Sequence, residues 1–290
     1  MTLPAVMQYI ISGLTTGSVY AMIAVGFTLV YNTCDLINFA QGEFAMLGGM
    51  LAAAAIGGWH LPPGPAAALA VLATAFIGGA AALCTIYPLR RASPLGLIIL
   101  TIGLSIIIRG GAMLAWGKDA RIMPNFSQGA PITILGANLG RQAIWVLGIA
   151  LCMAAGLILF FKRTNLGRAM RACAVNRRGA MICGINPRPL VVAAFALSAA
   201  LGAVGGIVIA PLTMTSYDVG IMLGLKGFCA AIVGGLSSMG GAVAGGLVLG
   251  ILEALGGGLV SSHLKEILAF LALLGILYLR PAGLFGRQGA

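Results

Sequence analysis

Three ionisable side chains interrupt stretches that are otherwise almost free of charge: Glu43, Arg109 and Glu253. An ionisable group inside a bilayer is costly, so such residues usually pair with one another, line a polar path or carry protons. Glu43 follows Asn38 and Gln41, and these three side chains could line the path of a polar solute. Arg109 and Glu253 are expected at a similar depth, which predicts a buried ion pair between them.

A second group of polar residues precedes this acid in the chain. Thr15, Thr16, Ser18 and Tyr20 lie in one apolar run and could hydrogen-bond a passing solute, so we assign them to the same path as Asn38, Gln41 and Glu43. The alternative for the hydroxyls is equally open, because Thr and Ser in membrane helices often bond to their own backbone.

Composition decides the class of protein that holds these residues. Of 290 residues, 60% are apolar and 8% are charged, whereas soluble domains are about 25% charged. A water-exposed surface cannot be made from so few charges, so the net charge of +11 does not indicate a nucleic-acid-binding protein. The composition predicts an all-α polytopic membrane protein.

Enzyme chemistry is not indicated. The chain has no G-x-x-x-x-G-K-[ST] phosphate loop, no H-E-x-x-H and no G-x-S-x-G, so we predict no catalytic residue. Six scattered cysteines and two distant histidines predict neither a metal site nor a cofactor.

Apolar runs long enough to cross a bilayer, which takes about 20 residues, organise residues 1–290 as a single transmembrane domain. About nine transmembrane or re-entrant helices are predicted, the seventh short and glycine-interrupted. They are Met7–Tyr31, Leu36–Ile56, Pro65–Leu89, Leu95–Gly117, Gln142–Phe161, Pro189–Leu212, Ile221–Gly235, Gly241–Val260 and Leu264–Leu279.

Small residues four apart predict close helix packing. Glycine accounts for 44 residues, about twice its usual share, and pairs occur at Gly13/Gly17, Gly202/Gly206, Gly241/Gly245 and Gly246/Gly250. Such pairs let helix backbones approach in lipid. The alternative is chance in a glycine-rich chain.

Basic residues predict the orientation. With the N-terminus outside, the inner loops hold eleven Lys and Arg and the outer loops four, as the positive-inside rule requires. Seven of the eleven lie in the loop 162–188, between the fifth and sixth segments, which has no acid. Topology and attraction to anionic lipid would explain that charge, but not the helical pattern over Leu166–Ile182.

Five stretches resemble the permease subunits of branched-chain amino acid ABC importers. They are GLTTGSVYAMIAVGFTLVY (Gly13–Tyr31), INFAQGEFAMLGG (Ile37–Gly49), GRAMRACAVNRRGAMICGIN (Gly167–Asn186), GLKGFCAAIVGGLSSMGGAVAGG (Gly224–Gly246) and RPAGLFG (Arg280–Gly286). The resemblance implies a multi-pass bacterial inner-membrane protein. Its partners would be a second homologous permease, two cytoplasmic ATPase subunits, a periplasmic or extracellular binding protein and membrane lipid.

That resemblance gives the loop 162–188 a role. Without a phosphate loop, the chain would need an external ATPase, and a helix over Leu166–Ile182 would dock it. Gly167 and Gly184 would mark the ends of this helix, and Met170, Ala174 and Met181 would form its docking face, or else a membrane-facing stripe. Arg171 and Asn176 belong to the same coupling motif, although Arg177 and Arg178 after Asn176 replace the usual small or acidic residues.

The expected function is therefore translocation of branched-chain or related hydrophobic amino acids, driven by separate ATPase subunits. Permeases for urea, short amides or aromatic acids are alternatives within the same family. A gradient-driven transporter or channel, with Glu43 or Glu253 carrying a proton, is the alternative outside it.

Overall fold

The computed structural model describes residues 3–89, 93–134, 136–259 and 265–286. Within them the chain is almost entirely helical, apart from one short hairpin, as predicted for an all-α membrane protein. The elements in chain order are α1 (Leu3–Cys34), α2 (Gln41–Trp59), α3 (Pro63–Ala81), the π-helical turn η1 (Ala82–Ile86), α4 (Pro94–Trp116), β1 (Ile132–Ile134), β2 (Ala137–Leu139), α5 (Arg141–Arg163), α6 (Asn165–Val175), α7 (Arg177–Ile182), α8 (Pro187–Thr213), α9 (Val219–Gly234), α10 (Met239–Leu259) and α11 (Lys265–Leu279).

Each predicted apolar segment coincides with a helix in this order. Six of the described helices are long and apolar enough to cross a membrane: α1, α3 with η1, α4, α5, α8 and α10. The seventh segment forms α9, which is one uninterrupted helix of 16 residues despite its glycines. At about 1.5 Å per residue, α9 is shorter than the hydrocarbon core is thick.

Helix boundaries follow local signals. Ser93 caps α4, because its hydroxyl accepts a hydrogen bond from the amide of Gly96, and Pro94 occupies the first helical position. Asn186 caps α8 in the same way, followed by Pro187. The second predicted segment began at Leu36, but α2 starts only at Gln41, because residues 35–40 form an irregular link after α1.

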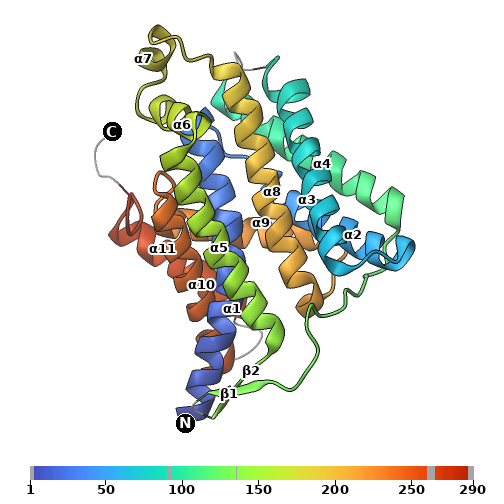
Figure 1. Ribbon diagram of the computed structural model, residues 1–290. Helices are drawn as coiled ribbons and strands as arrows, with labels where there is room; N and C mark the ends of the chain where they lie inside the picture. The colour runs from blue at the N-terminus through green and yellow to red at the C-terminus, as the bar shows by residue number, and fades with distance from the viewer. Residues whose placement is uncertain (1–2, 90–92, 135, 260–264, 287–290) are drawn as a thin grey trace.

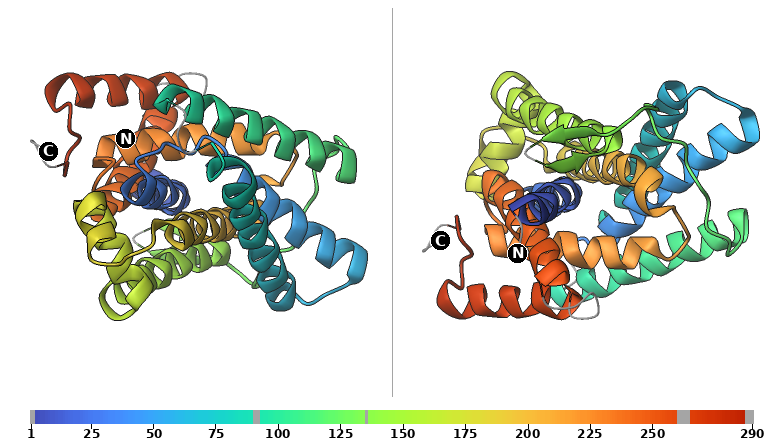
Figure 2. Two further views of the ribbon diagram at one scale, coloured as in Figure 1. Left: turned by 90° about the horizontal axis from the view of Figure 1, so that it is seen from above. Right: turned by 90° about the horizontal axis from the view of Figure 1, so that it is seen from below.

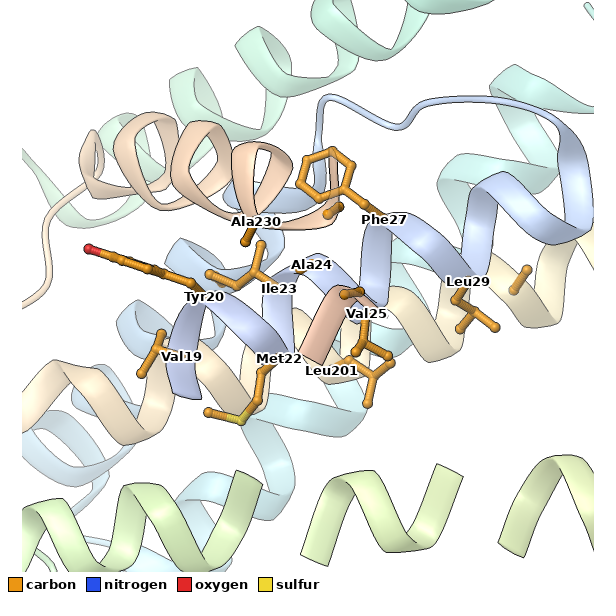
Figure 3. Packing of buried hydrophobic residues seen from close by; sticks show 14 of the residues in the cluster. Val19, Tyr20, Met22, Ile23, Ala24, Val25, Phe27, Leu29, Leu201 and Ala230 are labelled. Carbon is orange, nitrogen blue, oxygen red and sulfur yellow. The ribbon is translucent and has the colours of Figure 1, made fainter. Parts of the chain in front are cut away.

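The long helix α1 lies at the centre of the molecule, surrounded by α5, α8, α9 and α10 (Figure 2). Its apolar side chains point in all directions: Ile23 and Phe27 toward α9, and Val25 toward Leu201 on α8 (Figure 3). A helix that is apolar all round is buried in a membrane protein by its neighbours. In contrast, α5 lies at the periphery and is mostly exposed.

Glycines set the closest helix contacts. A Cβ on Gly250 of α10 would lie 2.3 Å from the Cα of Gly17 on α1, and one on Gly17 would lie 2.8 Å from the carbonyl of Gly246. These two predicted pairs, Gly13/Gly17 and Gly246/Gly250, therefore face one another across the α1–α10 contact. Backbone contact of this kind stabilises helices in lipid by close packing.

The two ends of the bundle differ in character. The helices α6 and α7 lie together at one end, and the N-terminus and the β1–β2 hairpin lie at the other (Figure 1). The hairpin is antiparallel, with Ile132 opposite Leu139. Gln8 of α1 ties it down, because its side-chain amide bonds both the amide and the carbonyl of Asn138.

Candidate functional site

Glu43 lies in the first turn of α2 and is 2% exposed. The hydroxyl of Ser105 on α4 donates a hydrogen bond to its Oε1 at 3.0 Å. Its other oxygen, Oε2, is buried and has no hydrogen-bond partner among the described residues. A buried carboxylate oxygen without a partner costs free energy, which makes Glu43 a candidate to bind a solute.

The surroundings of Glu43 carry charge of both signs. Arg109 on α4 lies close enough to favour its negative charge, and Asp218, directly before α9, close enough to oppose it. The first turn of α2 also favours an acid, because the helix dipole is positive at that end. Gly220 of α9 allows the approach, since a Cβ there would lie 2.5 Å from Glu43 Oε2. We call Glu43, Ser105, Arg109 and Asp218 the acidic site.

Gln41 faces away from this site, into the packing between helices. Its Nε2 donates to the carbonyl of Ser198 on α8 at 2.9 Å, and the Ser198 hydroxyl contacts both Gln41 Oε1 and the carbonyl of Gly26 on α1. A Cβ on Gly26 would collide with the Gln41 amide. Gln41 thus joins α1, α2 and α8, which is a structural task that the sequence did not reveal.

Asn38 lies in the link before α2 and is completely buried. Its Oδ1 accepts from the amide of Ala40, which shapes the approach to α2, while its Nδ2 has no partner within the described part of the chain. Thr101 of α4 holds the same link, because its hydroxyl accepts from the amide of Phe39.

Three of the four hydroxyl-bearing residues assigned to the path in α1 bond to their own helix. Thr15 donates to the carbonyl of Ile11 and Ser18 to that of Leu14, four residues earlier in each case. Thr16 likewise donates to Ser12. These three hydroxyls therefore bond to their own backbone, which was the alternative to a role in the path. These bonds do not bring them to the acidic site.

The predicted ion pair between Arg109 and Glu253 is wrong. Lys226 of α9 bonds Glu253 of α10 instead, with Nζ and Oε1 2.7 Å apart, and both side chains are largely buried. Tyr20 of α1 joins this pair, since Lys226 Nζ lies 5.7 Å from the centre of its ring. Glu253 and Arg109 were expected at a similar depth in the membrane. Because α9 packs against α10, however, Lys226 lies next to Glu253.

The coupling segment is two helices rather than one. Asn176 leaves the helical conformation and its Oδ1 accepts from the amide of Gly179, so it ends α6 and caps α7. Gly184 follows α7 with a φ of +82°, the left-handed conformation expected after a helix end. Gly167 lies in the first turn of α6, where its amide donates to the cap residue Thr164 and α6 crosses the backbone of Phe160 and Phe161.

The docking face proposed for this segment needs correction. Met170 is 1% exposed and packs in the main core, because α6 turns that side toward α1 and α5. Ala174 and Arg171 are exposed, as is Met181. The most exposed apolar side chains of α6 and α7 are Val175 at 86% and Ile182 at 87%.

Sequence reasoning missed Ser105 and Ser198, and it did not assign Lys226 a partner. A signal existed for Lys226, because it is a cation within a predicted span, where an acidic partner from another span is expected. No signal singles out the two serines, since their role depends on which helices adjoin α2.

Comparison with known proteins agrees with this architecture. A model of the family described as "Branched-chain amino acid transport system / permease component" matches residues 9–277. The high-affinity branched-chain amino acid transport system permease protein BraD of Pseudomonas aeruginosa is 33% identical over 97% of this chain and 96% of its own. LivH of Escherichia coli K12, described likewise, is 32% identical over the same shares.

A more distant relative is the ribose import permease protein RbsC of Escherichia coli K12, 28% identical over 81% of this chain and 74% of its own. No solved structure matches the chain. The family match spans both α1, with its buried polar neighbours, and the α6–α7 segment. The chain therefore belongs to the permease components of branched-chain amino acid transport systems.

Proposed function

We propose that the chain is the membrane-spanning subunit of an ATP-driven importer for branched-chain amino acids. The observation that carries the proposal is the near full-length similarity to BraD and LivH, whose descriptions name that substrate class. A more distant relative is named for ribose import, so relatives of this chain are named for different solutes. Urea, short amides and aromatic acids therefore belong in the test as competing substrates.

The proposed complex contains a second homologous permease, two cytoplasmic ATPase subunits and an external binding protein. Energy would enter at the α6–α7 segment, which sits at one end of the bundle (Figure 1). Its exposed apolar residues, Val175, Met181 and Ile182, form the docking patch of the proposal, in place of Met170. Exposed apolar side chains at an aqueous end of a protein are typical of a partner interface.

The solute would pass the acidic site. Glu43 Oε2 has no hydrogen-bond partner among the described residues and could accept a hydrogen bond from the ammonium group of an amino acid. Weak binding suits an importer, because a solute delivered by a binding protein must also leave the permease. Thr15, Thr16 and Ser18 support the path less well, since their hydroxyls already bond within α1, and the Tyr20 ring lies 5.7 Å from Lys226 Nζ.

The substrate test is uptake by the complete importer in a strain that lacks its own branched-chain systems. We expect uptake of labelled leucine, isoleucine or valine that stops when the partner ATPase is inactivated. Uptake that persists without the ATPase and collapses with an uncoupler would establish the gradient-driven alternative.

Coupling is tested on the docking patch. Val175→Asp with Ile182→Asp should leave insertion intact but reduce substrate-stimulated ATP hydrolysis at least tenfold, because a charged patch cannot enter an apolar groove. Val175→Leu with Ile182→Leu is the matched control and should keep normal turnover. Normal turnover in the double Asp variant would show that the segment does not couple.

A further inference from the structure

An apolar groove runs along the outside of the bundle over α1, with α5 and α10 as its walls. Its volume is about 540 Å³, within the range of ligand sites. Leu151 and Ile158 of α5 line it and are 72% and 55% exposed, so the groove opens at the peripheral face of the bundle. Of the residues given roles above, Ser18 and Arg171 also line this groove.

One end of the groove is cationic. Lys162, in the last turn of α5, and Arg171 of α6 line that end together with the polar Asn32 and Ser237. In the described part of the chain, no acidic residue lines the groove. The ion pair found among the described residues is that of Lys226 with Glu253, so neither of the two cations has an acidic partner there.

The shape of the groove limits what can occupy it. The lining residues of α1 run from Leu14 to Asn32, a length of about 27 Å. An extended hydrocarbon chain is thin enough to lie along this length.

We propose that this groove binds an anionic phospholipid. The acyl chain lies along α1 between α5 and α10, and the phosphate lies between Lys162 and Arg171. The apolar length matches hydrocarbon. The two cations, which form no ion pair among the described residues, match a phosphate, and they lie at the same end of the groove. On the orientation proposed here that end faces the cytoplasm, where anionic lipids attract basic residues.

The site links two parts of the molecule. Lys162 belongs to a membrane helix and Arg171 to the α6–α7 segment, so a phosphate held between them ties that segment to the bundle. The lipid would thereby help to hold the segment in place, whichever amino acid the importer carries.

The test is lipid binding to the intact importer complex, measured by native mass spectrometry with phosphatidylglycerol and with phosphatidylcholine of the same acyl chains. We expect preferential retention of phosphatidylglycerol. Lys162→Gln with Arg171→Gln should weaken that binding roughly thirtyfold, since each cation near an anionic lipid contributes about fivefold. Phosphatidylcholine binding should not change.

Matched controls separate the site from bulk charge. Arg163→Gln with Arg178→Gln removes two exposed cations that do not line the groove and should keep normal binding. Lys162→Arg with Arg171→Lys keeps the charge and should also bind. Ala154→Phe, inside the groove, should weaken retention of both lipids, while Ala155→Phe, outside it, should not.

Two results would overturn the proposal. One is unchanged phosphatidylglycerol binding in the Lys162→Gln, Arg171→Gln variant. The other is efficient cross-linking of Ala154→Cys to the second permease in native membranes, which would make the groove a subunit interface. Neither result depends on the substrate, so failure here leaves the proposed function standing.

Discussion

Two buried acids of this chain have opposite surroundings. Glu253 bonds Lys226 directly, and the pair sits between α1, α9 and α10. Glu43 bonds a serine hydroxyl through Oε1, and among the described residues it forms no salt bridge. A compensated buried charge is typical of structural residues, and an under-compensated one is typical of functional residues.

We expect Glu43→Gln to fold normally and to reduce substrate uptake on the order of tenfold, because a charged hydrogen bond to the solute is lost. Uptake is measured with labelled amino acid at matched permease levels. Asp218→Asn is the control, since it removes a nearby exposed carboxylate and should have a smaller effect. Normal uptake by the Glu43→Gln variant would show that Glu43 has only a structural role.

For the Lys226–Glu253 pair we expect non-additive effects. Lys226→Met or Glu253→Gln alone should cost about 3–5 kcal/mol of stability, because each leaves one buried charge without its partner. The double variant should be more stable than either single one, as judged by thermal unfolding in detergent. For the comparison pair, Arg109→Gln and Glu253→Gln, the stability losses of the two single variants should add in the double variant. A double variant more stable than this sum would contradict the observed pairing.

The sequence predicts which individual residues are important, but it predicts their contact partners poorly. Charge inside an apolar run identifies Glu43 and Glu253 without any structure. Their partners depend on which helices adjoin, and Arg109 and Lys226 are both cations within predicted spans. Gln41 illustrates the same limit, because its neighbours Gly26 and Ser198 lie 15 and 157 residues away in the chain.

At the scale of whole helices, the closest contacts are made at glycines. The α1–α10 contact has no room for a methyl group at Gly250, which lies against Gly13 and Gly17. Spacing alone predicted these residues as contact points, and the structure shows which pairs meet. The α6–α7 break was not predictable from helical pattern, because Asn176 acts through a local hydrogen bond rather than through apolar periodicity.

We expect Gly250→Ala to separate α1 from α10 and to cost about 1–3 kcal/mol, as overpacked cores do. The matched control is Gly156→Ala on α5, where an added methyl group meets nothing within 4 Å. Thermal unfolding of the two purified variants makes the comparison. Equal stability of both would mean that the contact at Gly250 is not close.

The whole molecule is polarised along the bundle axis. The α6–α7 segment, which lies within the cation-rich loop 162–188, is at one end, and the hairpin and N-terminus are at the other (Figure 1). This separation is what the basic-residue count predicts if the cation-rich end faces the cytoplasm. Arg90, Arg91 and Arg287, which also enter that count, lie outside the described residues.

Orientation can be tested with single cysteines in a cysteine-free background. Arg177→Cys and Ala120→Cys are suitable positions, because both side chains are exposed and they lie in α7 and in the loop after α4. The native cysteines must be removed first, although Cys173 would react poorly, since burial raises the pKa of its thiol and lowers the thiolate fraction. An impermeant maleimide applied to intact spheroplasts should label Ala120→Cys and should label Arg177→Cys only after lysis. The reverse labelling pattern would show that the orientation is opposite to the one proposed. The α6–α7 segment would then lie outside the cell, where no cytoplasmic ATPase could reach it.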